Sequence, residues 1–220
     1  MQPLHALIIN CTLKPAPKKS ETQALIDKVV TKYKELGVTT ECVRFIDHNI
    51  KPGVHSDMGN GDEWPQILEK MKRCNICIIA TPIWMGRAAS PVQRIFERLD
   101  AIFSEKQLSD RQTGQFFPYN KVAGALITGN EDGAHHVASH ILWAMQEFGF
   151  TIPPNANSYW VGKAGGSENY TDGGGERLEY TNKTNLYLVH NTVYMAQLLR
   201  DHPISTNIKK LNEAAKQESD

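Results

Sequence analysis

The sequence has no excess of charge of either sign and no long hydrophobic run. Lysine and arginine together number 24, as do aspartate and glutamate. The chain therefore lacks the basic surplus typical of proteins that bind nucleic acid or anionic membranes. No stretch reaches the roughly 20 apolar residues that span a bilayer, and the N-terminus has no cationic start before its short apolar run. We expect a cytoplasmic protein without a nucleic-acid or membrane partner.

Cysteine is scarce, and metal-ligand patterns are incomplete. Cys11, Cys42, Cys74 and Cys77 mostly lie in or beside predicted strands, where reduced cysteine packs as a small hydrophobe. Cys74 and Cys77 have the CxxC spacing of some redox and metal sites, but no second pair at ligand spacing accompanies them. His136 and His140 are one helical turn apart without a neighbouring carboxylate or third ligand. We favour structural cysteines and predict no metal site.

Apolar runs alternate with segments of helical periodicity along the chain. Strands are predicted over 4–10, 39–45, 74–81 and 121–128, with a less clear fifth strand formed by 151–152 and 159–162 at a sheet edge. Helices are predicted over 21–36, 64–72, 91–103, 134–148 and 184–200. This alternation favours an α/β fold, a five-stranded parallel sheet with helices on both faces.

The length predicts one domain over residues 1–220. Within it, residues of about 155–179 form a Gly-rich insertion, and residues of about 203–220 form a C-terminal tail. The insertion is too long for an ordinary connection. It is either a lid over a site, an interface with another subunit, or a disordered surface loop.

Three strand-to-helix loops are predicted to meet where ligands bind in open α/β sheets, beyond the carboxyl ends of the strands. The first loop, 11–22, combines hydroxyls, lysines and the free N–H groups of a helix start, which together suit a phosphate. It has neither the GxGxxG nor the GxxxxGK[ST] fingerprint. The alternative for this loop is an ordinary helix cap built from Ser20 and the residues that follow it.

The loop after the third predicted strand reads Thr81-Pro82-Ile83-Trp84-Met85-Gly86. Proline stiffens the exit from the strand, glycine allows close approach, and an aromatic stands at the tip, which together suit a flat ligand. A buried structural tryptophan is the alternative for Trp84. The loop after the fourth strand, Thr128-Gly129-Asn130-Glu131-Asp132-Gly133, suits a turn that brings backbone close to a ligand, or a plain turn.

With these residues in view, residues 1 to about 152 resemble the flavodoxin-like NAD(P)H-dependent FMN reductase and quinone reductase superfamily. The resemblance is strongest in T-P-I-W-M-G and T-G-N-E-D-G. Many relatives read T-P-x-Y-x-G, so Trp84 stands where they have tyrosine. The resemblance implies a flavodoxin-like three-layer sandwich with strand order 2-1-3-4-5, and FMN at the junction of the first and third strands.

The resemblance also implies roles for individual residues. The phosphate of FMN would be held by Thr12, Lys14, Ser20, Thr22 and Gln23. The isoalloxazine edge would meet the segment of Thr81, Pro82, Ile83, Trp84, Met85 and Gly86, and the other side would be closed by Thr128, Gly129, Asn130, Glu131, Asp132 and Gly133. No catalytic residue is certain, because the flavin carries the chemistry; candidate modulators are Trp84, His135 and His136.

The function implied is an FMN-dependent oxidoreductase. NAD(P)H would be the transient hydride donor, and a quinone, a free flavin or another small aromatic the acceptor. Relatives commonly dimerise, so we expect a homo-oligomer, a homodimer or a homotetramer. Two alternatives use the same fold: a flavodoxin-type electron-transfer protein, which the zero net charge disfavours, and a non-enzymatic FMN-binding protein.

Overall fold

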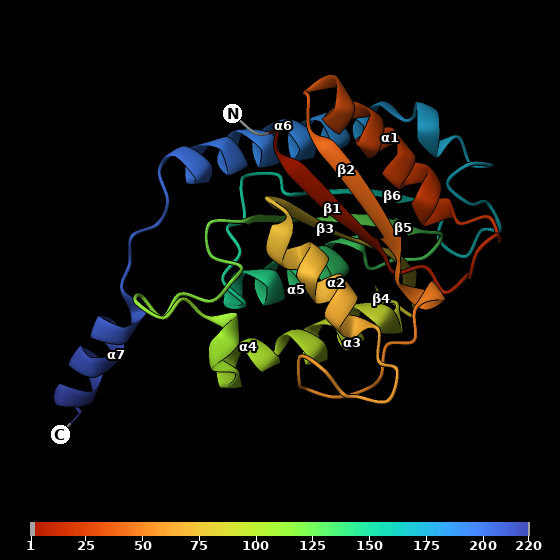
Figure 1. Ribbon diagram of the computed structural model, residues 1–220. Helices are drawn as coiled ribbons and strands as arrows, with labels where there is room; N and C mark the ends of the chain where they lie inside the picture. Colours follow the sequence, from red (N-terminus) through yellow and green to blue (C-terminus); the bar gives the residue numbers. More distant parts are fainter. Residues whose placement is uncertain (1–2, 220) are drawn as a thin grey trace.

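The central feature of the structure is a parallel sheet between two layers of helices (Figure 1). In this computed structural model, residues 3–219 are described. The parallel strands lie in the order β2-β1-β3-β5-β6. Their bounds are His5–Asn10 (β1), Thr39–Arg44 (β2), Ile76–Trp84 (β3), Val122–Gly129 (β5) and Asn157–Val161 (β6). The predicted order 2-1-3-4-5 is confirmed, because the short β4 (Arg87–Ala88) pairs antiparallel with β3 outside this path.

Alternating side chains of the strands build two cores. In β1, Leu7 and Ile9 pack in one core, whereas Ala6 and Ile8 pack in the other, because successive strand residues point to opposite faces. The first core lies under α2 (Trp64–Arg73), α3 (Ser90–Leu99), α4 (Ala101–Ser104) and α5 (Ala134–Glu147). The second lies under α1 (Glu21–Glu35) and α6 (Glu179–Asp201). Both faces of the sheet are covered, as the unbroken apolar runs predict.

Several predicted bounds differ from the structure. The helix predicted over 91–103 is two helices, because the chain turns at Asp100 between α3 and α4. The third strand continues through Trp84 into the β3–β4 hairpin. The fifth strand is β6 alone, and Thr151 forms only an isolated bridge to Val122. Three short 3₁₀ helices lie at Phe45–Asp47, Lys106–Leu108 and Gly175–Arg177.

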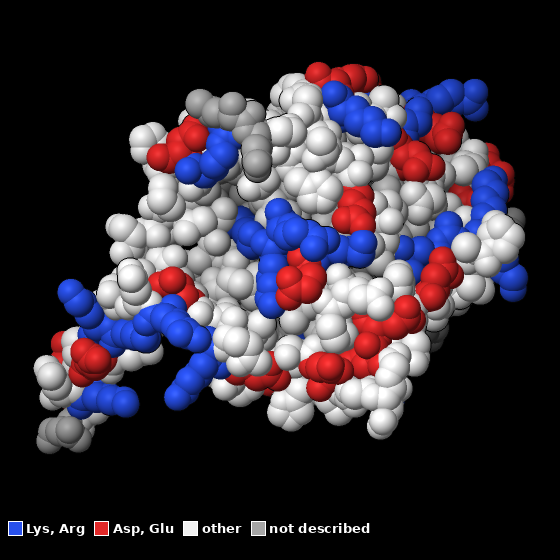
Figure 2. All heavy atoms as spheres, viewed as in Figure 1, with Lys and Arg blue, Asp and Glu red and all other residues white. Residues whose placement is uncertain are grey.

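The predicted C-terminal tail contains a further helix, α7 (Ile208–Gln217). Asn207 caps it by accepting a hydrogen bond from the backbone N–H of Lys210 at 3.0 Å. In Figure 1 this helix projects from the body of the fold, and none of its side chains is buried. Figure 2 shows charges of both signs on the same face, with basic side chains gathered over α2 and on α7. No helix within residues 3–219 is long and apolar enough to cross a membrane.

A buried ion pair fixes the irregular segment between β2 and α2. The side chains of Arg98 and Asp62 are fully buried, and their charged atoms lie 2.7 Å apart. Arg98 also donates to the backbone carbonyls of His55 and Lys51, both at 2.9 Å. The guanidinium stacks over the ring of Trp64 at 5.7 Å. One arginine of α3 thus holds three points of a segment that has little regular structure of its own.

Candidate functional site

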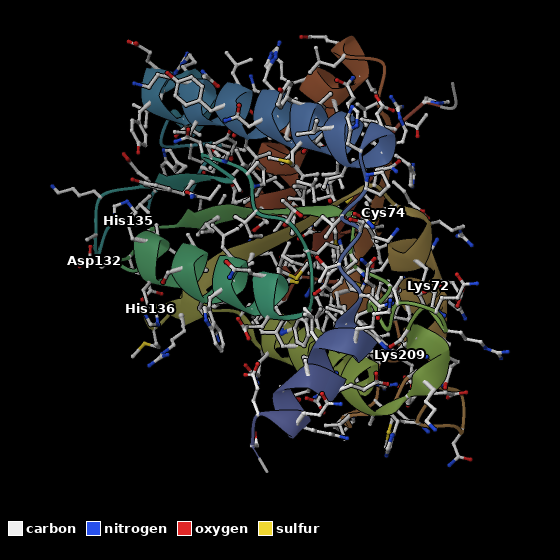
Figure 3. All side chains as sticks on the ribbon, turned by 90° about the vertical axis from the view of Figure 1, so that its left-hand side faces the viewer. Lys72, Cys74, Asp132, His135, His136 and Lys209 are labelled. Atoms are coloured by element: carbon white, nitrogen blue, oxygen red, sulfur yellow. The ribbon has the colours of Figure 1, made fainter. Side chains whose placement is uncertain are left out.

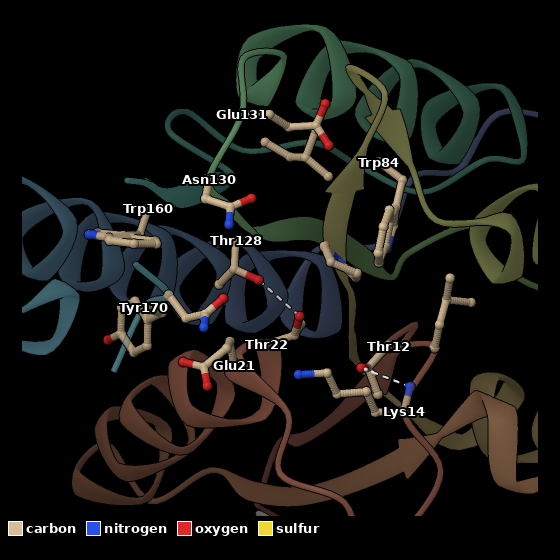
Figure 4. A pocket seen from close by; sticks show the side chains of 15 residues that line it. Thr12, Lys14, Glu21, Thr22, Trp84, Thr128, Asn130, Glu131, Trp160 and Tyr170 are labelled. Carbon is tan, nitrogen blue, oxygen red and sulfur yellow. Dashed lines mark hydrogen bonds between the residues drawn. The ribbon is translucent and has the colours of Figure 1, made fainter. Parts of the chain in front are cut away.

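A cavity of about 210 Å³ opens at the carboxyl ends of β1, β3 and β5, the edge where the three loops were predicted to meet (Figure 4). Its lining residues are Thr12, Leu13, Lys14, Glu21, Thr22, Pro82, Ile83, Trp84, Thr128, Gly129, Asn130, Glu131, Trp160, Asn169 and Tyr170. The volume is below the about 300–1,000 Å³ of most small-molecule sites. A ligand the size of a nucleotide would therefore extend beyond the cavity, across its mouth.

The floor of the cavity is a pair of threonine hydroxyls. The Oγ1 atoms of Thr22 and Thr128 lie 2.9 Å apart, and both side chains are buried. Thr12 stands beside them at the end of β1, where its hydroxyl accepts from the backbone N–H of Lys14 at 3.3 Å. In Figure 4 the Lys14 side chain extends toward Thr22. Hydroxyls, an ammonium group and the start of α1 thus meet at one end of the cavity, which is a suitable cradle for an anion.

Two residues predicted in this cradle are outside the cavity lining. Ser20 is the N-cap of α1 and accepts from the backbone N–H of Gln23 at 3.2 Å. The side chain of Gln23 accepts from Asn10 at 2.8 Å and donates to Asp27 at 2.9 Å. Both residues therefore organise the loop and the first turn of α1, in line with the helix-cap alternative for this loop.

The cavity carries two carboxylates and one ammonium group. Glu21 is held away from the anion cradle, because its Oε2 accepts from the backbone N–H of Thr171 at 2.8 Å and its Oε1 lies 3.9 Å from the ammonium of Lys19. Glu131 accepts from the β3–β4 hairpin, as described below. Both carboxylates therefore interact with groups other than Lys14. Lys14 is the basic residue of the lining, and its ammonium group is available to a bound anion.

The β3–β4 hairpin forms one wall of the cavity. Pro82, Ile83 and Trp84 line it, and Trp84 is 54% exposed, so the tryptophan is a surface wall and not a buried structural residue. Met85 and Gly86 form the turn, outside the lining. Thr81 is also outside: its buried hydroxyl accepts from the backbone N–H of Ala89 at 3.0 Å and fixes the return of the chain.

The loop after β5 forms the adjoining wall. Thr128, Gly129, Asn130 and Glu131 line the cavity, whereas Asp132 and Gly133 do not. Gly133 has a φ of 120° and packs directly on the hairpin: a Cβ atom at this position would lie 2.7 Å from the carbonyl oxygen of Gly86. The two loops are therefore in backbone contact, which only glycine permits here.

The wall opposite Trp84 comes from Trp160, Asn169 and Tyr170, which the sequence reasoning missed (Figure 4). The segment 162–178 reaches this position because its backbone N–H groups bond to the loop after β5: Gly162 donates to Gly129 at 2.9 Å and Gly165 to Asn130 at 3.1 Å. Tyr170 is fully buried, with its ring edge-on to Trp160. The aromatic residues inside the Gly-rich stretch were the signal that this segment packs as a wall.

The two histidines proposed as modulators lie outside the cavity. Figure 3 shows them on the first turn of α5, pointing in different directions. His135 lies 3.0 Å from the hydroxyl of Tyr159, which lies 3.2 Å from that of Tyr180. This second hydrogen bond, together with burial, raises the pKa of Tyr159 to about 12. The histidines therefore border the loop after β5 without facing the cavity.

Figure 3 also places Cys74 at the far end of the sheet from the loop after β5. Cys11, Cys74 and Cys77 are buried, whereas Cys42 is exposed. Across residues 3–219 no three His, Cys, Asp or Glu side chains are grouped to hold a metal ion.

The cavity fits flavin mononucleotide on three counts. The hydroxyls of Thr12 and Thr22 with the start of α1 and Lys14 suit a phosphate, the buried floor suits the polyol chain, and the indole of Trp84 at the mouth suits a flat ring. All of these residues line the same cavity. The residues present therefore agree with the ligand that the sequence resemblance implies.

Comparison with known families agrees with this geometry. Residues 4–166 match the family described as NADPH-dependent FMN reductase. The chain belongs to this family. FMN reductases of this kind bind FMN and use NAD(P)H, so the chain is an enzyme of the flavoprotein oxidoreductase class.

Individual relatives extend the comparison. The chain is 42% identical, over 226 residues, to the 8-demethyl-8-aminoriboflavin-5'-phosphate synthase of Streptomyces davaonensis, covering 99% of this chain and 86% of that protein. The crystal structure of RosB with bound 8-demethyl-8-formylriboflavin-5'-phosphate has a TM-score of 0.90 at 41% identity, covering 99% and 88% of the two chains. An archaeal flavodoxin, at 12% identity with a TM-score of 0.55 and coverage of 88% and 99%, shows the flavodoxin-like fold alone.

Proposed function

We propose that this FMN reductase family member passes hydride from NAD(P)H through bound FMN to a small acceptor such as a quinone, a free flavin or another aromatic. The observation that carries the proposal is the cavity itself, which is lined both by an anion cradle and by the indole of Trp84. The family match to NADPH-dependent FMN reductases supports the same activity.

Each set of lining residues would have a role that follows from its position in the cavity. Thr12, Lys14 and Thr22 would hold the phosphate, and Trp84 would face the ring at the mouth. When bound, the flavin supplies the capacity to accept and donate hydride. Trp160 and Tyr170 close the opposite wall and exclude water from that side. The open mouth beside Trp84, which is half exposed, leaves space for a nicotinamide and then an acceptor to approach in turn.

A second candidate treats the flavin as the substrate. The 42% identity to an enzyme named for producing 8-demethyl-8-aminoriboflavin-5'-phosphate favours it, as does the structural match to RosB holding a formylated riboflavin phosphate. In this case the same cavity would bind riboflavin 5'-phosphate, which is FMN, and replacement of its 8-methyl group by an amino group would consume an oxidant such as dioxygen and an amino donor, both supplied from solution.

One experiment separates the two. The purified protein is loaded with FMN and mixed with NADPH or NADH and a quinone, and nicotinamide oxidation is followed by absorbance. A parallel sample is incubated in air with an amino acid as amino donor, and the flavin is then extracted from both samples and its mass measured. Nicotinamide oxidation with unchanged flavin mass supports the reductase, whereas a changed flavin mass supports flavin modification. A protein that takes up no FMN would exclude both.

A further inference from the structure

The turn of the β3–β4 hairpin presents two backbone donors to one carboxylate. Met85 and Gly86 are the two turn residues between the paired Trp84 and Arg87, and both have positive φ, 51° and 72°. This is the two-residue type I′ geometry of tight hairpins. The N–H of Met85 donates to Oε1 of Glu131 at 3.0 Å, and that of Gly86 donates to Oε2 at 3.1 Å. Both donors of the turn are therefore occupied.

This contact lies at the edge of the cavity. Glu131 and Trp84 both line the cavity, and Met85 is the residue after Trp84. Release of the carboxylate would leave both N–H groups without an acceptor, in the turn that directly follows Trp84 of the cavity wall. An isoalloxazine ring carries carbonyl oxygens and ring nitrogens that accept hydrogen bonds along one edge. The ring edge and the Glu131 carboxylate need the same two donors, and each donor serves one strong acceptor at a time.

The Glu131 side chain is free to move, whereas the β3–β4 hairpin is not. Gly133 packs backbone to backbone on Gly86, so closely that a Cβ atom on Gly133 would lie 2.7 Å from the Gly86 carbonyl oxygen. The turn therefore cannot shift toward the loop after β5. Glu131 is partly exposed, so its carboxylate can be rehydrated after it leaves. Its release therefore costs less than release of a buried charge.

We propose that Glu131 is an internal ligand of the Met85 and Gly86 N–H pair and that the polar edge of the flavin ring displaces it on binding. This inference rests on the proposed function, which places a flavin in this cavity. Glu131 lowers the apparent affinity of the site, because only the fraction of molecules with the donors free is competent to bind. The competition concerns the ring, so it acts equally on FMN and on riboflavin, which has no phosphate.

The test is titration of FMN and riboflavin, followed by quenching of flavin fluorescence, with the wild type, Glu131→Gln and Glu131→Ala. Both variants are expected to bind both flavins at least about fivefold more tightly, the lower end of usual coupling free energies. The matched control is Asp172→Asn, which removes an exposed carboxylate from the segment that forms the opposite wall. Its affinities are expected to equal those of the wild type. Circular dichroism and thermal melting establish that each variant is folded.

Three outcomes would overturn the inference while the site itself stands. Unchanged or weaker binding in folded Glu131 variants would mean that the carboxylate does not compete with the ring. If the Glu131 variants bind FMN more tightly but riboflavin equally, the carboxylate acts by repelling the phosphate. If Asp172→Asn gains as much affinity as the Glu131 variants, the gain reflects a general effect of negative charge. If the wild type and all variants bind neither flavin, the proposed function fails, and this inference fails with it.

Discussion

The hydroxyl groups of Thr22, at the start of α1, and Thr128, at the end of β5, are hydrogen-bonded at 2.9 Å although 106 residues separate them in the sequence. Both side chains are buried at the floor of the cavity. Because a hydroxyl both donates and accepts, each can keep this bond and still contact a ligand. The pair joins the proposed phosphate end of the site to the loop that carries Glu131.

Removal of two hydroxyls at the phosphate end is expected to weaken FMN binding. Hydrogen bonds to charged groups contribute about 1.5–3 kcal/mol each, so Thr12→Ala, Thr22→Ala, which removes two hydroxyls of the cavity lining, should bind FMN at least about tenfold more weakly. Riboflavin binding should change far less. Thr31→Ala, which removes an exposed hydroxyl from the same helix, is the control. Equal FMN affinity in the double variant and the wild type would place the phosphate elsewhere.

Trp84 is expected to contribute a ring contact that tyrosine can replace. Aromatic pairs add about 0.5–1.5 kcal/mol beyond area burial, so Trp84→Ala should weaken binding of FMN and riboflavin about 2- to 12-fold or more, whereas Trp84→Tyr should bind nearly as well as the wild type. Fluorescence titration measures both. Trp143→Ala is the matched control, because Trp143 is similarly exposed, at 63%, on α5. An equal loss in the control would contradict a specific role for Trp84.

Gly133 is expected to tolerate no side chain. Gly133→Ala places a Cβ against the Gly86 backbone in addition to the strain of a φ of 120°, and the strain alone is of order 1–3 kcal/mol. Gly165→Ala introduces a positive-φ alanine where the space is open. In urea denaturation, Gly133→Ala should lower the free energy of unfolding by more than Gly165→Ala does. Equal losses would show that conformational strain, and not contact with the hairpin, dominates.

Stability is expected to fall in acid through Asp62. Burial alone would raise the pKa of this carboxyl, but hydrogen bonds from Arg98 and from the backbone N–H groups of Met58, Lys51 and Trp64 lower it from 3.8 to about 2. Because the pKa of Asp62 is lower in the folded protein than in the unfolded chain, the ionised carboxylate stabilises the fold. This stabilisation is complete when the pH is above the pKa of the unfolded chain, and it is lost as the pH falls through the pKa of the folded protein. The shift corresponds to roughly 2 kcal/mol, lost between about pH 4 and pH 2.

The check is the free energy of unfolding measured across this pH range. Asp62→Asn should be destabilised at neutral pH by about 3–5 kcal/mol, because it leaves Arg98 buried without a counter-ion, and should lose less further stability between about pH 4 and pH 2. Asp57→Asn alters an exposed carboxylate of the same segment that accepts only a local N–H and should follow the wild type. If Asp62→Asn loses as much stability between about pH 4 and pH 2 as the wild type does, the acid sensitivity belongs to other groups.

The strands of the sheet and the edge that carries the cavity were predictable because they depend on periodic patterns, whereas the order of the strands was implied by the family resemblance. The central residues of β1, β3 and β5 (6–9, 76–80 and 122–127) include no polar side chain, so they predict strands covered on both faces, and the loops that follow them must share one sheet edge. The cap at Ser20 was one of two alternatives that the residues after it suggested, the other being a phosphate contact.

The parts not predicted depend on tertiary contacts. Trp84, Met85 and Gly86 suggested an irregular loop, whereas pairing of Trp84 with Arg87 makes them the end of a hairpin. Tyr170 belongs to a Gly-rich stretch without periodicity, and its burial against Trp160 follows from backbone bonds to a loop more than 30 residues earlier. No local pattern encodes contacts of this kind.

The cavity walls span residues 12 to 170 and derive from the ends of β1, β3, β5 and β6. No partly assembled sheet contains all of these walls, so the binding site is complete only when β6, the outer strand, has joined. Parallel pairings between distant segments form slowly because loop closure precedes the contacts that reward it. A ligand that needs every wall binds only the finished fold and stabilises it by mass action. Flavin uptake during refolding would therefore report when all four of these strands have joined the sheet.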